Sequence, residues 1–432
     1  MLKKIQYSFS STIFQNLVIF IASILLARNH GPFAMGLWSI ITLIIGLLEV
    51  FNKHQFDIAS TYFVGKKIFK FKEAFTICLI ASFFFLVLTY LILLIFKSKL
   101  IIFFFQKEFE LGKKIYYLAI ISLPIIILYY NNLNHLITIN KVKQHLHLQN
   151  FFCILTFLGA FIIYQFKLNL IYTFIFFFII PGLICNFYFY IQYFRKTNFC
   201  RINKNLVLQY IKFSSKMYIT NIIIISFFYV FRYYGVLSLN IETLAFLTIA
   251  ISIANLFSQL IPSSLYSILY SKLSYSKNKS DETRYTLSFF KISIIFNLIF
   301  CLFFYFIIDN FIISLYGEKF KEVSNIFKNI ILVFIMYNSS LPLNIYFNAT
   351  GKSEINMYVF FFSFIITLIY LIFYNTALNE ILISINLGFL LIFILRILFF
   401  IKISNCKLKN LFVFKDEFFL VKSQFENFSW KK

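Results

Sequence analysis

Long apolar runs, each bounded by a short polar stretch, recur along the whole chain. A helix needs about 20 apolar residues to cross the hydrocarbon core of a bilayer. The pattern predicts twelve spanning helices, near residues 9–27, 35–51, 74–96, 115–137, 148–166, 170–194, 213–237, 243–269, 286–308, 326–349, 355–375 and 381–401. The second run is short for a bilayer, and its helix could continue past Phe51 as far as Ser60.

The composition agrees with this pattern. The chain is 61% hydrophobic and only 13% charged, with a mean hydropathy of +0.84. No soluble domain can hide that much apolar surface, so the sequence predicts a multi-pass membrane protein. Its net charge of +24 would suggest nucleic acid as the partner of a soluble protein. In a membrane protein it indicates loops that face the anionic cytoplasmic leaflet, so no nucleic-acid partner is expected.

The distribution of basic residues predicts the orientation. With the N-terminus in the cytoplasm, 26 of the 40 Lys and Arg residues fall in cytoplasmic segments and 10 on the opposite side. Both termini are therefore expected in the cytoplasm. The connection from Lys97 to Lys114 is an exception, with five basic residues on the outer side. We expect it to lie along the outer membrane–water interface.

One stretch, Phe311 to Lys352, has an unusual order of features. A charged segment with Tyr316-Gly317 leads into an apolar run, and the polar residues 338–340 and Pro342 interrupt that run. Polar groups in the middle of a span seldom face lipid, so this break is expected to point inward, to a polar cavity. Residues 101–141 repeat the same order more faintly, which suggests two related halves.

Arg232, inside the seventh predicted span, is the strongest candidate for a functional residue. An unpaired charge facing lipid there would cost about 2.5–3.5 kcal/mol or more. At helical spacing Arg232 shares a face with Ser214, Tyr218 and Asn221, and this face is predicted to line a cavity. The alternative is that Arg232 extends to the outer headgroups, because the run ends soon afterwards.

Other polar residues form weaker patterns. Asn255 and Gln259 belong to a polar row on the eighth span, which indicates either helix–helix hydrogen bonds or the wall of a hydrated groove. Arg28 lies at the outer end of the first span, and Arg396 near the inner end of the last, where we expect it to extend to the headgroups. The remaining candidates are three charged residues at i, i+4 spacing, which could form either a self-paired ladder or a gate: Glu49, Lys53 and Asp57.

The sequence offers no sign of an enzyme or of a cofactor. It contains no phosphate-binding loop, dinucleotide fingerprint or HExxH motif. The six cysteines are scattered without a CxxC pair, and the five histidines form no metal-ligand set. We therefore expect no catalytic residue, no metal and no cofactor.

Several segments resemble a known family. The N-terminal SILLARNHGPFAMGLWSIITLI is similar to the opening of the oligosaccharide-lipid flippases of the multidrug/oligosaccharidyl-lipid/polysaccharide exporter (MOP) superfamily, in which Ala-Arg, a Gly-Pro turn and a later glycine (here Gly36) recur. The segment FRYYGVLSLNIETLAFLTIAISIANLFSQLIPSSLYSILYSKLS looks like that family's spans seven and eight, and LYGEKF with NATGK like its spans nine to eleven. The chain departs from the family at Phe231, where many relatives carry an acidic residue, and at Gln55, where glycine is common.

The resemblance implies an all-α fold with two pseudo-symmetric six-helix bundles, 1–200 and 201–401, and a basic cytoplasmic tail, 402–432. It also implies a flippase in the bacterial inner membrane that moves an undecaprenyl-diphosphate-linked oligosaccharide to the periplasmic leaflet by alternating access, for O-antigen, lipopolysaccharide or other surface polysaccharide. Membrane lipids would be further partners, and H+, Na+ or the membrane potential could drive the cycle. The substrate-binding candidates are then Arg28, Asn221, Arg232, Asn255 and Gln259.

Three alternatives remain open. A drug/cation antiporter of the same superfamily should bury acidic residues, yet no Asp or Glu lies deep in spans three to twelve. An integral-membrane glycan polymerase or ligase should carry a long outer loop, and the outer loops here are short. A channel or structural membrane protein predicts no accumulation of a lipid-linked precursor after gene deletion.

Overall fold

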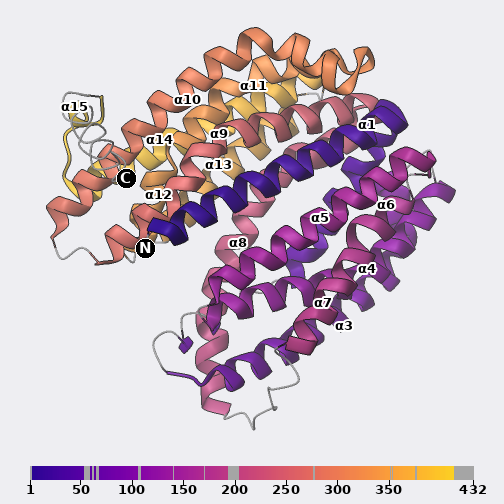
Figure 1. The fold of residues 1–432 in the computed structure, drawn as a ribbon. Coiled ribbons are helices and arrows are strands. Elements are labelled where there is room, and N and C mark those ends of the chain that lie inside the picture. The colour runs from indigo at the N-terminus through magenta and orange to yellow at the C-terminus, as the bar shows by residue number, and fades with distance from the viewer. Residues whose placement is uncertain are drawn as a thin grey trace, which may run out of the picture. The chain divides into compact units, whose positions relative to one another are not determined.

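The structure is a computed structural model that describes residues 2–52, 59–60, 63–64, 68–105, 109–139, 141–169, 171–192, 204–275, 278–350, 352, 354–374 and 377–412. Every regular element in these residues is a helix (Figure 1). In chain order they are α1 (Leu2–Asn52), α3 (Phe71–Phe105), α4 (Phe109–Thr138), α5 (Val142–Phe166), α6 (Tyr172–Phe174), the π-helix η1 (Ile175–Ile179), α7 (Ile180–Gln192), α8 (Lys204–Ser238), α9 (Ile241–Tyr275), α10 (Lys279–Tyr316), the 3-10 helix η3 (Glu318–Phe320), α11 (Glu322–Ser339), α12 (Leu341–Ala349), α13 (Glu354–Phe373), α14 (Leu378–Ser404) and α15 (Lys409–Phe412).

Eleven helical segments in the described residues are long and apolar enough to cross a membrane. The first of them contains two of the predicted spans, because α1 is broken at Gly31. Gly31 has φ +75° and ψ −176°, a conformation that side chains with a Cβ rarely adopt, and Pro32 cannot donate the next helical hydrogen bond. The twelve predicted spans are thus all found as helices, and the prediction of an all-α, multi-pass membrane protein is confirmed.

The helix boundaries correct one prediction and confirm another. Both described ends of the connection after Lys97 are helical, because α3 continues to Phe105 and α4 begins at Phe109. The predicted break in the stretch from 311 to 352 is present: α11 ends at Ser339, Ser340 caps it, and α12 begins at Leu341 with Pro342 in its first turn. A proline is tolerated there because the first N–H groups of a helix have no intrahelical partner.

The chain divides into two compact units. Unit 1 comprises Met1–Thr248 and Leu315–Lys319, and unit 2 comprises Ile249–Ser314 and Phe320–Lys432. By this division α8 packs with the N-terminal helices, although the resemblance implies that it belongs to the second bundle. A division into six-helix bundles at residue 200 therefore stays a prediction.

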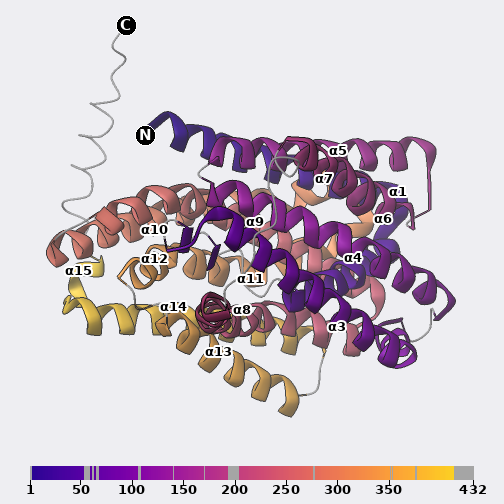
Figure 2. The ribbon, with the colours of Figure 1, turned by 90° about the horizontal axis from the view of Figure 1, so that it is seen from below.

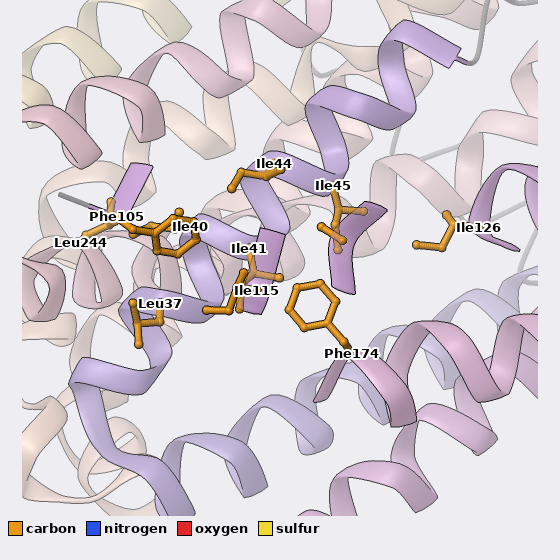
Figure 3. Close-up of a cluster of buried hydrophobic side chains, with 11 residues drawn as sticks. Leu37, Ile40, Ile41, Ile44, Ile45, Phe105, Ile115, Ile126, Phe174 and Leu244 are labelled. Atoms are coloured by element: carbon orange, nitrogen blue, oxygen red, sulfur yellow. The ribbon is translucent and has the colours of Figure 1, made fainter. Parts of the chain in front are cut away.

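In unit 1, α1 lies along α5 (Figure 1). Ser11 Oγ and Gln15 Nε2 on α1 donate hydrogen bonds to Asn150 Oδ1 on α5, at 2.7 and 2.8 Å. Deeper in the unit, buried side chains from several helices form an apolar cluster, in which Ile41, Ile115 and Phe174 converge (Figure 3). Burial of each such side chain contributes about 1.5–3 kcal/mol to folding in water, and in a membrane close packing takes over this role.

In unit 2, α11 and α12 form the centre. Most of Glu322–Ala349 is buried, and α13 and α14 run side by side next to it (Figure 2). The side chains of Asn338, Ser339 and Ser340 are all 0% exposed. The interrupted middle of this span therefore points inward, as the sequence predicts.

Candidate functional site

Arg28 lies on α1, three residues before the break at Gly31. Its side chain is exposed, and its Nε donates a hydrogen bond to the backbone carbonyl oxygen of Leu315 at 2.7 Å. One turn earlier on α1, the Ser23 hydroxyl lies 3.1 Å from the Tyr316 hydroxyl. These contacts attach Leu315 and Tyr316 to α1 within unit 1, so Arg28 has a structural role in addition to the one expected from the sequence.

Arg232 and Asn221 lie on α8, also in unit 1. Both side chains are half-buried, and neither makes a hydrogen bond or an ion pair with any described residue. Phe231, which stands where many relatives carry an acid, is fully buried and packs edge-on against Phe227 at 5.4 Å between ring centroids. The helix therefore directs its aromatic side chain into the unit and leaves Arg232 without a described anionic partner.

Asn255 and Gln259 lie one turn apart on α9, in unit 2, and both are half-buried. The Oδ1 atom of Asn255 is shielded from solvent and has no hydrogen-bond partner among the described residues. A buried acceptor without a donor costs about 1–3 kcal/mol, which makes Asn255 a good candidate for binding a hydroxyl group or a water molecule.

The gating candidates cannot be placed. Glu49 lies on α1, but its side chain is outside the described residues, and Lys53 and Asp57 lie outside them altogether. Of the substrate-binding candidates, Arg28, Asn221 and Arg232 belong to unit 1, and Asn255 and Gln259 belong to unit 2.

A polar core inside unit 2 was not predicted from the sequence. Asn338 Nδ2 donates to Ser258 Oγ on α9 at 2.5 Å, and Asn297 Nδ2 on α10 donates to Ser339 Oγ at 2.9 Å. Arg396 on α14 completes it by donating from a terminal nitrogen to Ser340 Oγ at 2.8 Å. The sequence pointed to residues 338–340, but their partners are 42 to 80 residues away and could not be read from it. The polar break is thus mostly filled by side chains: the cavity beside Ser258 and Asn297 measures only about 10 Å³.

Unit 1 contains a related arrangement. Asn131 Nδ2 on α4 donates to Ser82 Oγ on α3, and Asn132 Nδ2 donates to Asn186 Oδ1 on α7, both at 2.9 Å. In each unit, polar residues in the middle of the fourth span bond to the third and the sixth spans of the same repeat. This correspondence supports the two related halves that the order of features in the sequence suggested.

The position of the Arg396 side chain contradicts the prediction made from the sequence. It does not extend toward headgroups: the side chain is 0% exposed. The guanidinium carbon lies 4.9 Å from the centre of the Tyr337 ring and 5.5 Å from that of Phe360. Among the described residues, Nε and one terminal nitrogen have no hydrogen-bond partner, and no Asp or Glu lies within ion-pair distance. Arg396 is thus a buried positive charge without a described counter-charge.

The Arg396→Met variant is therefore expected to be more stable than the wild type. Replacing a buried ion pair by apolar side chains of similar volume is often stabilising by about 1–4 kcal/mol because the cost of desolvation disappears, and Arg396 carries that cost without the gain from a described counter-charge. The measurement is the thermal unfolding midpoint of the purified protein in detergent. Arg396→Ala is the matched control, and it should unfold below Arg396→Met because it also leaves a void. A lower midpoint for Arg396→Met than for the wild type would mean that the aromatic and hydroxyl contacts outweigh the desolvation cost.

No protein-family model and no curated protein sequence matches the chain, whereas solved structures match its fold. The lipid II flippase MurJ, in an inward closed conformation, is similar with a TM-score of 0.77 and 16% identity, over 98% of this chain and 93% of that one. A multidrug resistance MATE family transporter in an inward-facing conformation is similar with a TM-score of 0.72 and 12% identity, over 90% of this chain and 94% of that one. A transporter from Pyrococcus furiosus is similar with a TM-score of 0.65 and 11% identity, over 93% of this chain and 94% of that one.

The chain has the fold of the MOP superfamily transporters. The MATE-like fold class predicted from the sequence is therefore confirmed. At these identities the likeness concerns the fold, and it leaves the substrate to be argued from the residues of this chain.

Proposed function

We propose that the chain is a flippase that moves an undecaprenyl-diphosphate-linked oligosaccharide from the cytoplasmic to the periplasmic leaflet for surface polysaccharide synthesis, O-antigen and lipopolysaccharide included. The observation that carries this proposal is the fold shared with a lipid II flippase over 98% of this chain. The motifs of the first and seventh spans, which resemble oligosaccharide-lipid flippases, support the choice of substrate. The protein makes and breaks no bond in this proposal, so it is a transporter and not an enzyme.

Physical chemistry supports a charged, polar path for such a substrate. A diphosphate cannot cross hydrocarbon unless fixed cations and hydrogen-bond donors replace its water. Arg232 has the required properties, being half-buried and without a described counter-ion. In this proposal Arg232 and Arg28 contact the diphosphate, and Asn221, Asn255 and Gln259 contact the sugars.

The same proposal assigns the path of the lipid tail, the gate, the orientation and the energy source. The lipid tail stays among helices and membrane lipids, and two bundles alternate in access while Glu49, Lys53 and Asp57 form a gate. The protein lies in the bacterial inner membrane with both termini in the cytoplasm, since 26 of the 40 basic residues then face the anionic leaflet. H+ or Na+ serves as the coupling ion, or the membrane potential drives the cycle directly.

A drug/cation antiporter is the second candidate, because the same fold occurs in MATE transporters. A cation antiporter needs a buried acid that exchanges a drug for an ion. In unit 2 the described acids lie in the first turns of α10, α11, α13 and α14, and Asp309 is paired with Lys328 at 2.5 Å. This distribution disfavours the antiporter.

Deleting the gene in its source bacterium tests the proposal. We expect a lipid-linked oligosaccharide to accumulate with its glycan protected from a membrane-impermeant glycosidase in spheroplasts, and the wild-type gene should restore accessibility. A deletion strain that accumulates no such lipid and becomes more sensitive to cationic drugs would favour the antiporter instead.

A further inference from the structure

Unit 1 contains a cavity of about 450 Å³, within the size range of ligand pockets. Helices α1, α3, α4 and α8 enclose it, and aliphatic and aromatic side chains form most of its wall. Ile44 and Phe105, both visible in Figure 3, connect this wall to the buried apolar cluster of the unit. The cavity is separate from the half-buried Arg232, which does not line it.

The polar groups of the wall are largely occupied. The Tyr116 hydroxyl donates to the backbone oxygen of Leu93 at 2.5 Å and leaves its ring to the cavity. The Ser214 and Ser215 hydroxyls donate to backbone oxygens of their own helix, at 3.2 and 3.1 Å. A buried water needs 2–4 polar partners, so this cavity suits hydrocarbon better than water.

The cavity is continuous with the lipid-facing surface. Leu88, Ile92 and Ile211 line it, yet they are 43, 47 and 46% exposed. In a membrane protein, exposed apolar residues in the middle of a span face acyl chains. A chain from the adjoining leaflet can therefore enter between α3 and α8 without crossing a polar barrier.

We propose that this cavity holds an acyl chain of a bilayer phospholipid. The apolar wall, the occupied hydroxyls and the opening to lipid all favour that occupant. The chain fills the space between α3 and α8, and so supports the helix that carries Arg232. This inference does not depend on which substrate the protein transports.

Brominated lipids test the proposal, since bromine on an acyl chain quenches tryptophan only at close contact. The native tryptophans are first replaced in the full-length protein, as Trp38→Phe and Trp430→Phe. Leu93→Trp then reports on the cavity, because Leu93 lines it and is only 4% exposed. Leu94→Trp, on the neighbouring residue that is 63% exposed, shows full quenching by lipid. Leu136→Trp, buried at 1% in a cluster that shares no residue with the cavity wall, shows the background.

In vesicles of dibrominated phosphatidylethanolamine and phosphatidylglycerol, Leu93→Trp should lose fluorescence nearly as strongly as Leu94→Trp. Quenching no stronger than that of Leu136→Trp would overturn the proposal. So would relief of the quenching by undecaprenyl phosphate present at a small fraction of the lipid, because the occupant would then be a polyprenyl chain. If Leu93→Trp does not fold, Phe105→Trp serves as the reporter and Phe189→Trp, buried at 3% in a cluster that shares no residue with the cavity wall, as its control.

Discussion

The Arg232→Ala variant is expected to reach the membrane in normal amounts and to lose transport. Arg232 makes no hydrogen bond or ion pair with any described residue, so its removal leaves no protein partner unsatisfied. If the guanidinium contacts the diphosphate, its loss removes a charge-assisted contact worth about 1.5–3 kcal/mol, or roughly 10- to 150-fold. The measurement is the sidedness of the lipid-linked oligosaccharide in deletion cells that carry the variant.

Two matched variants sharpen this experiment. Arg232→Lys keeps the charge and should retain part of the transport, whereas Leu237→Ala, which truncates an exposed residue of the same helix, should behave as wild type. Membrane abundance is compared by immunoblotting in every strain. Normal transport by Arg232→Ala would exclude Arg232 from the substrate path and leave it as a residue that reaches the headgroups.

The Gly36→Ala variant is expected to lose much of its stability. A Cβ at Gly36 would overlap the backbone carbonyl oxygen of Ile241 and would lie 2.5 Å from the Cγ2 atom of that residue. Backbone cannot move aside as a flexible side chain can, so α1 must separate from the start of α9. Overpacking of this kind costs about 1–3 kcal/mol and sometimes more. The measurement is the thermal unfolding midpoint in detergent.

Gly235→Ala is the control for the effect of an added methyl group within a helix. A Cβ at Gly235 would lie 2.9 Å from Cδ1 of Leu244, the end of a flexible side chain that can move aside, so a smaller cost is expected. Gly36→Ala should therefore unfold at a lower temperature than Gly235→Ala. Equal midpoints would show that α1 and Ile241 can part at little cost.

Hydropathy was enough to predict the spans, because each helix in a bilayer must satisfy its own backbone hydrogen bonds. The break at Gly31-Pro32 and the interruption at Pro342 were also predictable, since both depend on local backbone chemistry. The continuation of α3 to Phe105 and the start of α4 at Phe109 were not predicted, because charged residues that follow an apolar run look the same in a helix as in a loop.

The position of Arg396 could not be predicted from the sequence. It lies eight residues before the end of α14 at Ser404, about 12 Å at 1.5 Å per residue, within reach of a side chain that bends along the helix. What decides its position is Ser340 and the rings of Tyr337 and Phe360, which come from other helices. Such contacts depend on tertiary packing, which hydropathy does not encode.

The candidate site, too, could be predicted only as far as helical spacing allows. Asn255 was singled out by its spacing, and the structure adds that its Oδ1 is buried without a partner. The sequence could not tell this side chain from Ser258, one turn of the same helix away, which is bonded to Asn338. Helical spacing shows which residues share a face, but only the packed structure shows which of them are already hydrogen-bonded.

The buried charge of Arg396 also has an electrical consequence. A guanidinium stays ionised at every physiological pH, and this one is enclosed within a spanning helix. Moving one elementary charge across the full thickness of a bilayer takes about 2.3 kcal/mol of electrical work per 100 mV. If a rearrangement of unit 2 moves Arg396 through part of the membrane field, the same fraction of this electrical work is added to the free energy of that rearrangement. The membrane potential would then favour one arrangement of unit 2 without the binding of an ion.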